Sequence, residues 1–259
     1  MNLFKLADKT GQAPDETLRL DENPFSTNKV TGWSLNFPIA RSCVPTKVCA
    51  KTCYFASGPS TWTASLAKQV RLQNRLNADP DGLADQIIDW VKRLRMGFVR
   101  WHGGGDMTAM TGRCLDRVAL RVGGVPQWVV TRRPALAAGI VPRPNVFVHI
   151  STDASSMRRL REFAAIAPPA LQWFWSYQCD AGEVPPPEVA AVVFRDHYKP
   201  MLAKAPAPDD CPLNWSEDIA GTCGRCRRCF DGTAVERAGQ LLPRLSTVLA
   251  ANEEWPHGS

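Results

Sequence analysis

Residues 32–56 read GWSLNFPIARSCVPTKVCAKTCYFA, a strand-like run that leads directly into three closely spaced cysteines. The first seven residues predict a short strand that ends at Pro38. Cys43, Cys49 and Cys53 follow within eleven positions, and three cations and a tyrosine lie among or beside them. These thiols could form disulfides that close a loop, pack in a core or bind a metal, and the rest of the sequence has to distinguish these three roles.

Helix-like and strand-like runs alternate along the rest of the chain. Residues 61–76 have helix-forming composition, and the next helix begins with Asp79 as its cap and Pro80 in its first turn. Further helices are expected around Cys114, over residues 157–166 and near the C-terminus. The expected strands are short, apolar runs, as strands buried on both faces should be, and they lie around residues 34, 99, 129, 148, 174 and 192.

This alternation predicts an α/β fold with a parallel sheet. Six such units make an incomplete barrel or an open doubly wound sheet, and we expect a partial (β/α)6 TIM-like barrel. An irregular, Pro/Gly-punctuated N-terminal arm is expected over residues 1–31. The barrel with the first cysteine loop follows over residues 32–199, and a Cys-rich, metal-binding extension with a C-terminal helix covers residues 200–259.

The composition predicts a protein of the cytoplasm, or of the host cytoplasm if a phage encodes the chain. The N-terminus has no apolar signal region, and no run of about 18 apolar residues occurs, so no membrane partner is expected. Nine cysteines in a reducing compartment disfavour a disulfide framework, and seven of them fall in two tight groups. A formal charge of +6 is too small to indicate nucleic-acid binding by itself.

The first group, with the spacing C-x5-C-x3-C, predicts an iron–sulfur centre. Thiolates are soft ligands that select zinc, copper(I) or iron–sulfur clusters. Three cysteines in one loop leave one position of a structural zinc site empty. A [4Fe-4S] cluster tolerates that count, because its fourth iron can take a substrate, a solvent ligand or a ligand from elsewhere in the chain.

The second group has a full complement of four thiols. Its spacing, C-x11-C-x2-C-x2-C, suits a loop that wraps a cluster, and zinc is the alternative metal. The protein then holds one cluster or two, and ligands shared between the groups also remain open. The four cysteines are Cys211, Cys223, Cys226 and Cys229.

A strand, a three-cysteine loop, a helix and a second strand that ends in Gly-Gly-acid together resemble the radical S-adenosylmethionine (SAM) proteins. That resemblance implies a partial barrel whose open iron binds SAM, with Gly104, Gly105 and Asp106 as contacts to SAM. At the end of a strand, Arg132 or Arg133 is expected to pair with a carboxylate of SAM or with a substrate phosphate, or else to form a salt bridge in its loop. The cysteine spacing here is wider than the C-x3-C-x2-C typical of that superfamily, and the aromatic residue, Tyr54, follows the last cysteine.

More narrowly, the chain resembles the phage-encoded gene product 88 family. The matching segments are SLNFPIARSC, CAKTCYFA, VRWHGGGD, VVTRRP, VHIST and the C-terminal CP…GTCGRCRRCF, which together span residues 34–230. The resemblance implies a phage or prophage origin and an iron–sulfur protein with a radical-SAM-like barrel. It supplies no established reaction.

Polar side chains at the strand ends are the remaining candidates for chemistry, because α/β barrels place their functional groups there. His149 lies between apolar strand neighbours and so points to the other side of its strand, and Tyr177 at the end of its strand is a candidate for stacking. Three functions follow. The first is SAM-dependent radical chemistry on a small molecule or nucleic acid, with an electron donor from the host. The second is a non-catalytic iron–sulfur redox or sensor protein, and the third is a zinc-stabilised nucleic-acid-binding module.

Overall fold

A computed structural model describes residues 10–11, 16–179, 190–194, 211 and 222–251. Its centre is a seven-stranded sheet whose strands stand side by side in the order of the sequence. β1 pairs antiparallel with β2, and every later neighbour pairs parallel. The strands are β1 (Ser26–Asn28), β2 (Gly32–Asn36), β3 (Val99–Gly104), β4 (Gln127–Thr131), β5 (Val146–Thr152), β6 (Gln172–Gln178) and β7 (Val192–Phe194).

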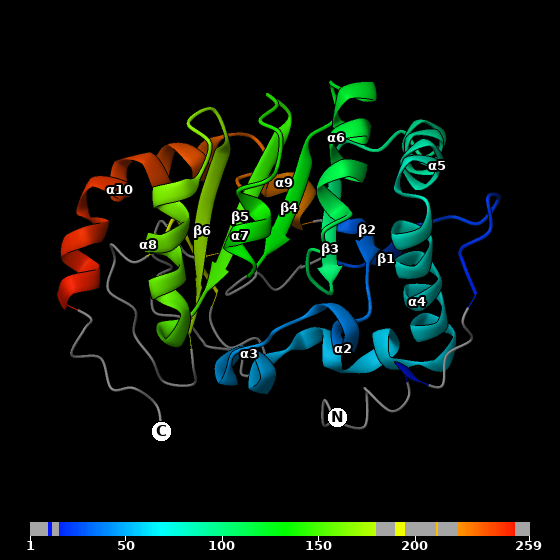
Figure 1. The fold of residues 1–259 in the computed structure, drawn as a ribbon, viewed down its shortest axis with the longest axis horizontal. Helices are drawn as coiled ribbons and strands as arrows, with labels where there is room; N and C mark the ends of the chain where they lie inside the picture. The colour runs from blue at the N-terminus through cyan, green and yellow to red at the C-terminus, as the bar shows by residue number, and fades with distance from the viewer. Residues whose placement is uncertain (1–9, 12–15, 180–189, 195–210, 212–221, 252–259) are drawn as a thin grey trace.

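The long helices cover one face of this sheet, and two short helices lie below the ends toward which the parallel strands point (Figure 1). The short pair is α2 (Ile39–Ser42) and α3 (Lys47–Thr52), followed by the 3-10 turns η1 (Tyr54–Ala56) and η2 (Gly58–Thr61). The remaining helices are α4 (Thr63–Ala78), α5 (Pro80–Arg93), α6 (Thr111–Arg121), α7 (Pro134–Ala137), the 3-10 turn η3 (Ala154–Ser156), α8 (Met157–Ile166), α9 (Thr222–Cys226) and α10 (Thr233–Ala251).

The helices form where their caps and apolar stripes predict them. The Asp79 side chain accepts a hydrogen bond from the Gly82 N–H at 2.8 Å and so caps α5, as predicted. The buried stripe of this helix includes Leu83, Ile87 and Val91, and it joins the main core. Local sequence therefore fixes the start of α5 and the face that it buries.

The two faces of the sheet have different neighbours. On β6, Trp173 packs edge-to-face against Phe163 of α8, with ring centroids 4.9 Å apart, so this face meets the helices. The opposite face carries Phe174, whose ring stacks on His149 of β5 at 4.6 Å. Side chains alternate between faces along a strand, so every second residue of β3 to β7 turns away from the helices. That second face carries the larger cavity described below.

Six predicted strands are confirmed, and the α/β class with them. Among the described residues the sheet is open, so a closed barrel is not observed. The prediction that residues 1–31 form an irregular arm is wrong at β1. There the Asn28 side chain accepts hydrogen bonds from Val30 and Thr31 and turns the chain back along the edge of β2. The boundary predicted at 199/200 lies outside the described residues. In the described ranges no helix is both long and apolar enough to cross a membrane.

Candidate metal centre

The first cysteine group converges on one cavity at the carboxyl end of the sheet. Cys43 ends α2, Cys49 lies within α3 and Cys53 ends α3. All three line a cavity of about 140 Å³ together with residues 103–106 and Arg132. The spacing C-x5-C-x3-C thus places three thiols from two short helices around the same small volume.

The electrostatics of these thiols suit metal ligands better than nucleophiles. Burial raises the pKa of the Cys43 thiol, and the negative charges of Asp106, Cys49 and Cys53 raise it further. Burial also raises the pKa of Cys49, although Arg132 opposes that change. A reactive thiol needs a lowered pKa, whereas a metal cation displaces the proton directly. Burial therefore keeps Cys43 and Cys49 from being activated as nucleophiles.

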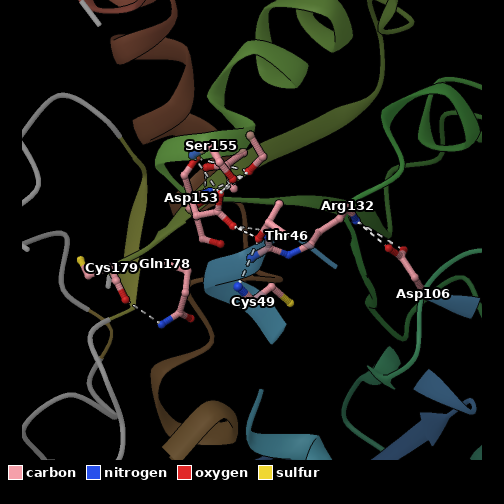
Figure 2. A network of polar contacts seen from close by, with 11 residues as sticks. Thr46, Cys49, Asp106, Arg132, Asp153, Ser155, Gln178 and Cys179 are labelled. Atoms are coloured by element: carbon pink, nitrogen blue, oxygen red, sulfur yellow. Dashed lines mark hydrogen bonds and ion pairs between the residues drawn. The ribbon is translucent and has the colours of Figure 1, made fainter. Parts of the chain in front are cut away.

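A polar network fixes α3 beside this cavity. The Thr46 side chain caps α3 by accepting from the Cys49 N–H at 3.1 Å, and its hydroxyl donates to Asp153 Oδ2. The same carboxylate oxygen accepts from the Arg132 guanidinium at 2.7 Å. Figure 2 shows Arg132 between Asp153 and Asp106. Burial acts to raise the pKa of Asp153, but Arg132 and these donors hold it below its usual range.

Asp106 is held by the protein's own donors. Its Oδ1 accepts from the Thr131 hydroxyl at 2.6 Å and from the Met107 N–H at 2.7 Å, and the Arg132 N–H points at both carboxylate oxygens from 3.2 and 3.3 Å. Burial raises the pKa of Asp106 above its usual range, and these hydrogen bonds only partly oppose that rise. The arrangement joins the ends of β3 and β4, which is a structural role for the acid of the Gly-Gly-acid motif. Its predicted contact with SAM stays a prediction.

The two glycines of the motif lack side chains, so the cysteine loop packs closely against them. A Cβ on Gly104 would lie 2.2 Å from the Phe55 ring, and one on Gly105 would lie 2.7 Å from Phe37 Cβ. Gly105 also has a φ of +79°, which only glycine adopts readily. The glycines therefore seat the cysteine loop against the sheet, and their predicted contact with SAM likewise stays a prediction.

His102 is an unusual neighbour of the same cavity. Its φ is +58°, it is 3% exposed, and its ring packs on Phe37 with centroids 4.9 Å apart. Within the described part of the chain neither ring nitrogen has a hydrogen-bond partner. Burial lowers the pKa of His102 to about 3, so the ring is neutral at pH 7.

The second cysteine group lines a larger cavity, of about 440 Å³, on the face of the sheet turned away from the helices. Cys211 lies beside β7, because its N–H donates to the Val193 carbonyl at 2.9 Å, and Cys223 and Cys226 lie on α9. Burial raises the pKa of Cys229, and the other three thiols of the group raise it further. All four thiols of the group line this one cavity, and their binding of a metal stays a prediction.

The two cavities share a wall. Tyr54, Arg100, Val130 and Ser151 line both of them. The Tyr54 hydroxyl donates to the Gly103 carbonyl and accepts from Arg100 at 3.0 Å. The two thiol groups thus border one continuous region, with Tyr54 and Arg100 between them.

This combination of cysteine groups and strand motifs coincides with a family match. A sequence model of one family, described as gene product 88, matches residues 5–232. The chain belongs to the gene product 88 family. No curated protein and no solved structure matches the chain. The family resemblance drawn from the sequence is therefore confirmed, whereas the resemblance to radical SAM proteins remains an inference.

In this gene product 88 protein the two predicted catalytic residues have different surroundings. The His149 ring accepts from Trp128 Nε1 at 3.4 Å through Nδ1, and its Nε2 lies 2.5 Å from Ser176 Oγ. His149 also lines the larger cavity, and burial lowers its pKa to about 3. This placement agrees with the inward orientation predicted for it.

Tyr177 lies on the other face of the sheet. Its side chain is fully buried in the core that the helices cover, and it lines neither cavity. Residues 173, 175 and 177 share one face because strand side chains alternate. The predicted stacking role of Tyr177 is therefore wrong.

Sequence reasoning missed the residues of the shared wall. Arg100 lies between apolar Val99 and Trp101 on β3, and its guanidinium lies 4.8 Å from the centre of the Trp128 ring. Phe230, which directly follows Cys229 and lines only the larger cavity, was missed as well, and its ring lies 6.0 Å from Trp128. An arginine two positions before His102, on the same side of a buried strand, was the available signal for this wall.

The donor set fits a thiolate-bound metal in kind, although the thiols are not arranged as a finished coordination shell. No disulfide joins the described residues, which include all nine cysteines. Cys114 and Cys179 are buried in the main core and line neither cavity. No group of three or more His, Cys, Asp or Glu side chains in the described ranges stands ready to hold a metal ion. Cavities with three and four thiols, and buried thiols that need a cation to ionise, are nevertheless suited to iron–sulfur clusters or zinc.

Proposed function

We propose that this protein is an iron–sulfur protein in which Cys43, Cys49 and Cys53 hold a [4Fe-4S] cluster with one iron open to a ligand. The observation that carries the proposal is the convergence of these three thiols on one small cavity at the carboxyl end of a parallel sheet. A three-thiol site leaves one iron for an exogenous ligand. The larger cavity, on the other side of Tyr54 and Arg100, has room for a small molecule next to that iron.

The reaction that we propose is reductive cleavage of SAM. When bound, such a cluster passes one electron from an external donor to SAM, which breaks a carbon–sulfur bond and yields methionine and a 5′-deoxyadenosyl radical. The chain's residues would hold α3 in place through Thr46 and Asp153, and exclude water with the apolar walls of the cavities. In this proposal β2–β7 are the six strands of a radical-SAM-like partial barrel.

A second function is a redox or sensor protein that holds the cluster without cleaving SAM. The hydrogen bonds that Asp106 already accepts from Thr131, Met107 and Arg132 favour it, because they occupy the acid of the motif that SAM would contact. The wider cysteine spacing favours it as well. The Cys211/Cys223/Cys226/Cys229 group holds a second cluster in either case, with zinc as its alternative metal.

The two functions separate in one preparation. The protein is purified without oxygen, reduced with dithionite and incubated with SAM, and 5′-deoxyadenosine is measured by chromatography. The enzyme predicts 5′-deoxyadenosine that depends on reductant and is lost in Cys49→Ala. A cluster that is reduced but forms no product assigns the second function. Zinc without iron or sulfide contradicts both, and leaves the zinc-stabilised nucleic-acid module, with Arg225, Arg227 and Arg228 beside the thiols.

A further inference from the structure

The larger cavity has a composition that its thiols do not explain. Its described lining includes four cations, Lys29, Arg100, Arg227 and Arg228, and no aspartate or glutamate. A volume of about 440 Å³ falls in the range of pockets that enclose small organic ligands, roughly 300 to 1,000 Å³. The cavity is therefore large enough for a small molecule, and apart from its four thiols the ionisable side chains in its described lining are cationic, with His149 neutral.

Arg100 offers a donor that the protein does not use. Its Nε is buried and has no hydrogen-bond partner within the described residues, although its NH2 group donates to Tyr54. A buried donor without an acceptor destabilises the fold, so such groups usually meet a ligand, a water or an ion. A guanidinium also matches the geometry of phosphate and carboxylate oxygens through paired N–H groups.

The wall beside Arg100 is aromatic. The Arg100 guanidinium lies 4.8 Å from the centre of the Trp128 ring, and His149 lies nearly parallel to that ring, with an interplanar angle of 5°. The Phe230 ring lies 6.0 Å from Trp128, stacks on Phe98 at 4.1 Å and has the Arg227 guanidinium over it at 5.1 Å. Aromatic ring edges next to cations line the cavity, and such surroundings suit a nucleobase that packs beside a bound phosphate.

We propose that this cavity binds a nucleotide, with its base against the Trp128–Phe230 wall and its phosphate on Arg100. A nucleotide would then be the substrate class of the proposed iron–sulfur protein. Its reaction rests on the proposed function, whereas its binding does not. Several cations without a carboxylate favour a phosphate dianion over a monoanionic carboxylate. Arg100 also lines the cavity of Cys43, Cys49 and Cys53, so a nucleotide held there would lie next to the three-thiol centre.

Isothermal titration calorimetry on the anaerobically purified full chain tests the proposal, with AMP, GMP, CMP and UMP, the four matching nucleosides and inorganic phosphate as probes. At least one nucleotide should bind about tenfold or more tightly than its nucleoside, because charge-assisted hydrogen bonds are worth about 1.5–3 kcal/mol. Inorganic phosphate should bind more weakly than that nucleotide. Nucleosides that bind equally well, or phosphate that does, would overturn the assignment.

Arg100→Gln should weaken nucleotide binding about tenfold or more, while Arg100→Lys should lose less because it keeps the charge. Arg93→Gln is the matched control. Arg93 also lies over a tryptophan, Trp90, at 5.3 Å, but it is an exposed residue of α5 outside both cavities, so its variant should bind like the wild type. Equal nucleotide affinities for Arg100→Gln and Arg93→Gln would show that Arg100 does not bind the nucleotide and that its charge only offsets that of ionised thiols.

A measurement on the wild type guards against a variant that fails to fold. Photo-crosslinking with 8-azido-AMP should label peptides that contain Trp128 or Phe230, and labelling confined to other peptides contradicts the proposal. Iron and sulfide are measured on the same sample. Nucleotide binding without iron refutes the iron–sulfur function but leaves this nucleotide site standing. Iron without nucleotide binding refutes the nucleotide site but leaves the iron–sulfur function standing.

Discussion

The two cysteine groups are held by different elements of the fold. Cys43, Cys49 and Cys53 come from helices α2 and α3, which a capped turn and an ion pair fix against the ends of the strands. The second group joins Cys211, which hydrogen-bonds to the Val193 carbonyl of β7, to three thiols on and after α9. The first group has three thiols and the second has four. Under the proposed function, the first cluster would therefore have an open iron and the second would not.

Replacing cysteines gives the largest effect that this comparison predicts. Cys53→Ala should remove the cluster at the first group, which is a loss of roughly four iron atoms, and leave the second cluster's electron paramagnetic resonance signal intact. Cys226→Ala should do the opposite. Thiolates supply the binding free energy of such centres, so neither group should keep its cluster without one of its ligands.

Cys114→Ala is the control, because Cys114 is buried on α6 and contacts neither group. It should leave both signals unchanged. Loss of both signals from either single replacement would contradict two separate centres and indicate one cluster with shared ligands.

Asp153→Asn should be the most damaging change that leaves all thiols in place. Its fully buried carboxylate pairs with Arg132, whose side chain is 12% exposed, and removing one partner of a buried pair costs about 3–5 kcal/mol. Urea unfolding should show this loss, together with weaker iron retention at the first group. Asp81→Asn breaks the exposed pair with Arg113 and should match the wild type. Equal stability of the two variants would show that the network does not support α3.

Gly104→Ala should have a smaller effect, confined to the first group. The added Cβ would lie 2.2 Å from the Phe55 ring, and overpacking of this kind costs about 1–3 kcal/mol. Thermal unfolding should show the loss, and the signal of the first cluster should change while that of the second stays. Gly123→Ala is the control, since its Cβ would meet nothing within 4 Å. A Gly104→Ala protein as stable as this control would refute the close seating of the cysteine loop.

The smallest effect is a pH dependence that comes from His149, on the face of the second group. Burial lowers its pKa to about 3, against about 6.5 in the unfolded chain. As pH falls below about 6.5 the unfolded state takes up a proton and the folded state does not. Stability is therefore present above pH 6.5 and is lost on acidification, by up to about 1.4 kcal/mol per pH unit.

Urea unfolding at pH 6.5 and at pH 5 should show a smaller loss for His149→Gln than for the wild type. His102, with the same lowered pKa, keeps its own contribution in both proteins. An identical loss in the two proteins would mean that His149 is protonated in the folded state.

The order of strands and the cysteine groups could be predicted from sequence, because buried strands and thiol spacing are local signals. β1 could not, since three polar residues, two exposed and one half-buried, carry no such pattern and pair with β2 where the Asn28 turn returns the chain. The shape of the open sheet depends on how the elements pack, which no local pattern encodes.

Strand alternation decides on which face of the sheet each predicted catalytic residue lies. Applied to Val148 and Ile150, it places His149 on the opposite face, where it lines the larger cavity, and its catalytic role stays a prediction. The same rule applied to Trp173 and Trp175 would have placed Tyr177 among the helices, where the structure has it. Arg100 was missed because its contacts are with Tyr54 and Trp128, which lie 46 and 28 positions away in the sequence and meet it only in the folded protein.

The most direct test of the central claim is the metal content of the wild-type protein purified without oxygen. Iron, acid-labile sulfide and zinc are quantified on one sample, next to Cys43→Ala and Cys114→Ala. The account predicts iron and sulfide in about equal amounts, which fall in Cys43→Ala and not in Cys114→Ala. Zinc without sulfide, or iron that Cys43→Ala leaves unchanged, would contradict the assignment of a cluster to the three-thiol cavity.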